Sequence, residues 1–192
     1  MIKINLLYQT PVEWSDVILS HFDAFLQDHA NCERKASALA LSMVMKYADK
    51  TKLIPPLIEL AQEELEHFRQ VYQIMEKRGL SLGAEMKDPY VNQLLEHCRQ
   101  PSEDRFVDRF LIYSIVETRG AERFRLIAEA LSEPELKLFY HKLWGSEAKH
   151  GQLFLRLLLE YNPSEVVYPR LEYLLQKEAT IVQNLEWRAS LH

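Results

Sequence analysis

Hydrophobic residues recur at helical spacing along most of the chain, and the alternation typical of half-buried strands is sparse. Ser102 and Ser132 are expected N-caps, and the stretch "RGLSLGAEMKDPY" is the least regular. The pattern predicts helices over residues 15–27, 28–49, 51–78, 89–99, 102–131, 132–161 and 162–188. Four long helices with shorter ones predict an all-α four-helix bundle with accessory N-terminal and C-terminal helices.

Polar residues interrupt the apolar face of the predicted helix 51–78 near its middle. Glu64 and His67 stand three residues apart, so they share a face, and that face is the apolar one. Their neighbours Glu63 and Glu66 point away from it and are expected in solvent. The segment "QEELEH" is therefore more than an acidic surface run.

The second half of the chain repeats this arrangement. Glu147 and His150 again stand three apart on an apolar face, in the segment "GSEAKHG". Glu33 lies on the apolar face of the helix before Glu64, and Glu117 lies on that of the helix before Glu147. Glu122, beside Glu117, is expected at the surface.

Burying four carboxylates costs several kcal/mol each, on the order of the penalty measured for buried ions, unless they are protonated or compensated. No lysine or arginine lies on these stripes near them. Two divalent cations would balance the charge, and neutral histidines complete a nitrogen–oxygen ligand set suited to iron or manganese. For any one of these residues a buried, hydrogen-bonded role is the alternative, but the six together favour a metal centre. The candidate ligands are Glu33, Glu64, His67, Glu117, Glu147 and His150.

One Glu from each of two helices and Glu-x-x-His from each of the other two is the pattern of ferritin-like di-iron carboxylate proteins. Gly151, in mid-helix beside His150, is expected either to let another helix or a substrate approach or to be merely tolerated in the packing. Cys32, beside Glu33, is expected to be a core residue rather than a ligand. No phosphate-binding loop, dinucleotide fingerprint or nucleophile elbow competes with the metal interpretation.

Composition narrows the class further. The 192 residues fit one domain, residues 1–192, and 47% hydrophobic with 27% charged residues is typical of a globular protein. A formal net charge of −5 argues against a broadly basic surface. Two cysteines and no membrane-length apolar run predict a cytoplasmic protein without a membrane partner.

Four stretches, "HANCERKASALALSMVMKYAD", "ELAQEELEHFRQVYQIMEKRG", "YSIVETRGAERFRLIAE" and "FYHKLWGSEAKHGQLFLRLL", resemble the bacterial tRNA 2-methylthio-isopentenyl-adenosine hydroxylase family. The resemblance covers roughly residues 10–190 and leaves the six candidate ligands unchanged. It implies a ferritin-like fold and two iron ions, bridged by an oxo or hydroxo group when oxidised. Glu64 and Glu147 would bridge the metals, and the other four would be terminal ligands.

The resemblance also implies the reaction and the partners. The family hydroxylates the isopentenyl side chain of a modified adenosine next to the tRNA anticodon, using O₂ and two electrons. The electrons come from an external donor such as a ferredoxin or reductase. Arg34, Lys35 and Arg119 are candidates for the rim of an RNA entrance, although solvated helix faces are the alternative. Tyr113, one turn before Glu117, is a candidate for the surroundings of the metal or for packing.

Three rival functions share parts of this pattern. A ferritin-like ferroxidase or iron-binding protein would use the same ligands but produce ferric mineral. A di-iron hydroxylase of another substrate would share the centre. A helical interaction module would bind no metal.

Overall fold

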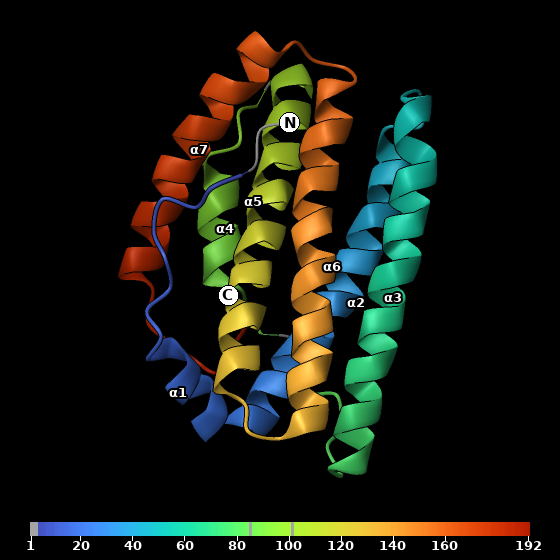
Figure 1. The fold of residues 1–192 in the computed structure, drawn as a ribbon. Coiled ribbons are helices and arrows are strands. Elements are labelled where there is room, and N and C mark those ends of the chain that lie inside the picture. Colours follow the sequence, from blue (N-terminus) through green and yellow to red (C-terminus); the bar gives the residue numbers. More distant parts are fainter. Residues whose placement is uncertain (1–3, 85, 101) are drawn as a thin grey trace. The chain divides into compact units, whose positions relative to one another are not determined.

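A computed structural model describes residues 4–84, 86–100 and 102–192. Within these ranges all regular structure is helical, which confirms the all-α prediction (Figure 1). The elements are α1 (Trp14–Ser20), α2 (Phe22–Lys46), the 3₁₀ turn η1 (Thr51–Leu53), α3 (Ile54–Lys77), α4 (Pro89–Glu96), α5 (Ser102–Ala130), α6 (Pro134–Leu159) and α7 (Ser164–Asn184).

Three predicted helix ends are wrong. The break expected between residues 27 and 28 lies at His21, because the buried stripe of α2 continues through Phe25 and His29. Asp28 does not cap a helix; its Oδ2 accepts a hydrogen bond from the Leu191 N–H at 2.8 Å.

The N-cap of α6 is Glu133 rather than Ser132, with Pro134 in the first turn, where its missing N–H costs nothing. The last helix ends at Asn184, since Leu185 has extended backbone angles. The cap predicted at Ser102 adjoins Pro101, and Pro101, like Glu85 in the irregular stretch, lies outside the described residues.

The chain groups into two compact units, which we describe one at a time. The α2–α3 unit comprises Val17–Lys87 and Arg188–Leu191. Its two long helices are antiparallel: Ser37 Oγ donates to Ala61 O at 2.7 Å near one end, and Arg78 Nε donates to Asp23 Oδ1 at 2.8 Å near the other. A short link through η1 joins them, so the register is set locally.

The α5–α6 unit comprises Met1–Asp16, Asp88–Trp187 and His192. Helices α5 and α6 are also antiparallel, with Phe110 against Phe154 at 5.8 Å and Phe124 against Tyr140 at 5.7 Å between ring centroids. Figure 1 shows α6 along one side of α5, with α4 and α7 toward the other side, and α7 contacts α5 through the Arg119–Glu178 hydrogen bond. Helix α5 is therefore covered on several sides, and it carries buried residues around most of its circumference.

Gly151 lies at a close approach between α5 and α6. A Cβ built on Gly151 would lie 2.6 Å from Thr118 Oγ1 and 3.1 Å from Ser114 O. Ser114 Oγ also donates a hydrogen bond to the Gly151 carbonyl. The approach of another helix, which was one of the expectations for Gly151, is therefore observed.

The single-domain prediction stays a prediction. None of the described helices is long and apolar enough to cross a membrane.

We predict that Gly151→Ala destabilises the metal-free protein by about 1–3 kcal/mol, the usual cost of overpacking, because the new methyl group meets α5 backbone. The measurement is urea unfolding monitored by circular dichroism. Gly145→Ala is the matched control. Among the described residues nothing lies within 4 Å of the added Cβ at this exposed position of α6, so the change should be neutral or stabilise by up to about 1 kcal/mol. Equal stability of the two variants would contradict the close approach.

Candidate metal centre

In the α2–α3 unit, two glutamates and a histidine converge where the helices cross. Glu33, Glu64 and His67 each offer one ligand atom, and these atoms lie within 4.8 Å of one another. His67 Nδ1 lies 3.2 Å from Glu64 Oε2 and 3.6 Å from Glu33 Oε2. All three side chains are buried. The Ser37–Ala61 hydrogen bond, one turn away, holds the two helices in the register that brings Glu33 opposite His67.

The α5–α6 unit builds a second set of the same composition. Glu117, Glu147 and His150 offer ligand atoms within 4.8 Å of one another, and His150 Nδ1 lies 3.3 Å from Glu147 Oε2. Glu147 and His150 are buried, whereas Glu117 is half-buried. The close approach at Gly151, next to His150, brings this part of α6 against the turn of α5 that carries Glu117.

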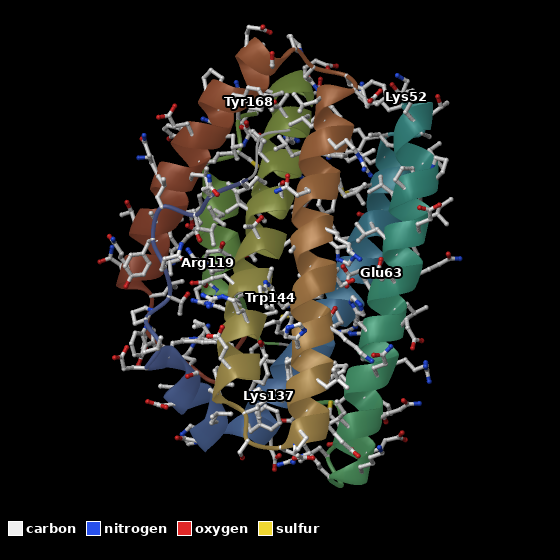
Figure 2. All side chains as sticks on the ribbon, viewed as in Figure 1. Lys52, Glu63, Arg119, Lys137, Trp144 and Tyr168 are labelled. Atoms are coloured by element: carbon white, nitrogen blue, oxygen red, sulfur yellow. The ribbon has the colours of Figure 1, made fainter. Side chains whose placement is uncertain are left out.

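The chemistry of each set fits a divalent transition metal. Each set contributes two carboxylates and one imidazole whose Nδ1 faces a carboxylate. One divalent cation would balance the two negative charges, and mixed oxygen–nitrogen donors suit iron. The surface glutamates behave differently: Glu63 is exposed (Figure 2), and hydrogen bonds from Arg69 and Gln70 lower the pKa of Glu66 to about 2.

His29 was missed by sequence reasoning. Its Nε2 lies 2.6 Å from Glu33 Oε1, it is fully buried, and its ring stacks on Phe25 at 5.6 Å. A signal was present, because Phe25, His29 and Glu33 follow one another at four-residue spacing on one face of α2. Tyr113 holds the corresponding place before Glu117; it is buried and its ring packs against Phe154 at 5.9 Å.

The candidate RNA contacts have different outcomes. Arg34 is exposed and donates to Asn31, and Lys35 is half-buried, so both remain candidates. Arg119 does not belong to an exposed rim, because its side chain is fully buried. Cys32 is half-buried rather than part of the core, and it lies outside the two candidate ligand sets among the described residues.

Arg119 is the centre of a buried polar network in the α5–α6 unit (Figure 2). Its Nε donates to Glu178 Oε1 at 2.8 Å, its Nη1 to Glu122 Oε2 at 2.9 Å, and its Nη2 to Tyr8 O at 2.8 Å. The expected surface position of Glu122 is also wrong, since the Thr10 N–H and hydroxyl both donate to it at 2.7 Å. The N-terminal segment and α7 cover the face of α5 that we expected in solvent.

These contacts and the burial of the network shift the pKa values of Arg119, Arg123 and Tyr90. Burial opposes the charge of Arg119, but the hydrogen bond and charge of Glu178 outweigh it and raise the pKa of Arg119. Burial, with the nearby charge of Arg119, lowers the pKa of Arg123 to about 10. Burial and the Glu178 charge raise the pKa of Tyr90 well above its usual value, and its hydroxyl donates to Glu178 at 3.1 Å. At neutral pH the network therefore contains two cations, with a neutral phenol.

Two helix pairs that each bring together two glutamates and a histidine, all buried except the half-buried Glu117, define a ferritin-like protein with a carboxylate–histidine site able to bind metal. The chain belongs to the family described as tRNA-(MS[2]IO[6]A)-hydroxylase (MiaE), whose match spans residues 1–192. This confirms the family resemblance seen in the sequence.

Two curated relatives are named tRNA 2-(methylsulfanyl)-N(6)-isopentenyladenosine(37) hydroxylase. The protein of Pseudomonas putida is 33% identical, over 95% of this chain and 89% of its own. The protein of Salmonella typhimurium is 27% identical, over 82% of this chain and 75% of its own.

A solved structure, named Protein 43 with aldehyde deformylating oxygenase activity from Synechococcus, superimposes with a TM-score of 0.93 at 34% identity. The match covers 98% of this chain and 96% of that chain. It confirms the ferritin-like, all-α fold class.

Replacing Arg119 by Met should destabilise the protein by about 3–5 kcal/mol, the usual result of leaving a buried partner charge uncompensated. Glu178, its partner, is also fully buried. Arg125→Met on the same helix is the control: its pair with Glu129 is surface-exposed, so the expected loss is below about 1 kcal/mol. The measurement is the free energy of unfolding of both variants by chemical denaturation. Similarly small losses in the two variants would mean that the Arg119 network is not a tight ion pair.

Proposed function

We propose that the protein is an O₂-dependent di-iron hydroxylase of the 2-methylthio-isopentenyl-adenosine next to the anticodon of tRNA. The observation that carries the proposal is the recurrence of two Glu₂His sets, buried except for the half-buried Glu117, in a chain whose family match spans residues 1–192. The names of the two curated relatives support the same substrate and reaction.

The six residues would hold two iron ions within a single domain of residues 1–192. Glu33 and His67 are the proposed terminal ligands of one iron, and Glu117 and His150 those of the other. Glu64 and Glu147 are the proposed bridging carboxylates. The iron supplies O₂ activation, and the protein supplies ligand geometry and a site that excludes water.

The stoichiometry of the proposed reaction determines which co-substrates and electron donor it requires. One oxygen atom of O₂ is inserted into a C–H bond of the isopentenyl group to give C–OH. The other oxygen atom takes up two electrons and two protons and leaves as water. An external donor, of the ferredoxin or reductase class, must therefore deliver the electrons. A tRNA substrate supports the cytoplasmic location that we propose. Arg34 and Lys35 remain proposed phosphate contacts, close in sequence to Glu33. Tyr113 remains proposed for the surroundings of the second metal.

The test is nucleoside mass spectrometry of tRNA that carries the methylthio-isopentenyl adenosine, incubated with iron-loaded protein, a chemical electron source and O₂. We expect one added oxygen on that nucleoside. Glu64→Ala and Glu147→Ala should abolish it, because each removes a carboxylate from a ligand set. Glu63→Ala, one residue from Glu64 but exposed, should retain activity. An unchanged nucleoside, despite bound iron and O₂ consumption, would rule out this substrate.

A second candidate function is favoured by one observation, the 34% identity to the protein with aldehyde deformylating oxygenase activity. The same loaded protein should then be given an aliphatic aldehyde in place of tRNA. Formate from the aldehyde, with no change in the tRNA nucleoside, would make aldehyde deformylation the better account. Oxygen on the nucleoside and no formate would exclude it.

A further inference from the structure

His29 lies outside both ligand sets, yet it contacts one of the ligands through a short hydrogen bond. We infer that His29 is a positioning residue that holds the Glu33 carboxylate with one oxygen turned toward the metal. The inference rests on the metal centre of the proposed function and goes beyond it by assigning a role to a residue that binds no metal.

The two oxygens of Glu33 have different neighbours within the α2–α3 unit. Oε1 lies 2.6 Å from His29 Nε2, and Oε2 lies 3.6 Å from His67 Nδ1. An ionised carboxylate accepts only, so His29 Nε2 carries the proton and donates it. The bond engages Oε1, whereas Oε2 is the oxygen that lies toward His67. Glu33 is thereby prepared to bind through one oxygen.

The His29 ring is itself held in place. It is fully buried, and it stacks on Phe25 with ring centroids 5.6 Å apart and planes 25° apart. Phe25, His29 and Glu33 lie on consecutive turns of one helix, so this contact needs no other element to form it. A donor that cannot rotate away fixes the carboxylate more firmly than water would. Hydrogen bonds of this kind typically change metal affinity by 10–100-fold when removed.

The second ligand set differs at the matching position. Four residues before Glu117 the chain carries Tyr113, a phenol in place of the imidazole that precedes Glu33. The two halves of the centre are therefore chemically unequal. Loss of His29 should weaken one of two bound metals and leave the other.

The experiment is a Co(II) titration of the metal-free full-length protein, followed by the visible d–d absorption. Wild type should bind two equivalents. His29→Phe keeps an aromatic ring for the Phe25 stack but removes the donor, and it should weaken one equivalent about 10–100-fold with an altered spectrum. His29→Gln loses the stack but restores an N–H donor, and it should bind more tightly than His29→Phe. A merely structural role for the ring predicts the opposite order.

Two controls keep the test decisive. Tyr113→Phe should leave the equivalent that depends on His29 unchanged. Should His29→Phe fail to fold, His29→Gln against His29→Met gives the same comparison, since the two side chains have similar length and differ in the donor.

Two equivalents bound by His29→Phe or His29→Met as tightly as by wild type would overturn the positioning role while leaving the metal centre intact. A wild-type protein that binds no Co(II) would instead contradict the metal centre of the proposed function.

Discussion

The placement of two acidic side chains and one imidazole inside each antiparallel helix pair is the constraint on which the rest of the structure depends. In the α2–α3 unit the carboxylates meet His67 at 3.2 and 3.6 Å, and in the α5–α6 unit Glu147 meets His150 at 3.3 Å. Buried carboxylates at such distances destabilise a fold unless cations or donors compensate them. Helix register, glycine placement and neighbouring donors can all be understood as conditions for keeping these groups buried.

Each unit fixes its register by a different device close to its ligands. In the α2–α3 unit, Ser37 bonds the Ala61 carbonyl one turn from Glu33 and Glu64. In the α5–α6 unit, Gly151 lets α6 reach the α5 backbone, where Ser114 bonds its carbonyl. On another face of α5, Arg119 ties the helix to Glu178 of α7 and to Tyr8 of the N-terminal segment. Because Arg119 is two residues from Glu117, this network also restrains the part of α5 that carries this proposed ligand. Buried ion pairs of this kind define one arrangement more than they add net stability.

The sequence was sufficient for the order of the long helices and for the two Glu₂His groups that the structure brings together, whose role as metal ligands stays a proposal. The Glu-x-x-His spacing puts both side chains on the apolar face of a helix. This follows from helix geometry alone, so it can be recognised without knowing the tertiary structure. The environment of α5 was not predictable in the same way. Arg119 and Glu122 were expected to face solvent. The segments that cover them, α7 and the N-terminal segment, are distant in the sequence, so residue spacing within α5 could not predict the contacts. The predicted break between residues 27 and 28 failed for a related reason: Asp28 lies within α2, and its carboxylate accepts from the Leu191 N–H, a partner far away in the chain. His29 lay within reach of sequence reasoning, as its four-residue spacing from Glu33 was visible.

The central claim is that each Glu₂His set holds one iron ion. Anomalous X-ray diffraction at the iron edge, on crystals of the iron-loaded protein, tests it most directly. The account predicts two iron peaks, one bound by Glu33 and His67 and the other by Glu117 and His150, with Glu64 and Glu147 contacting both. A single peak, or no iron at these six residues, would contradict it.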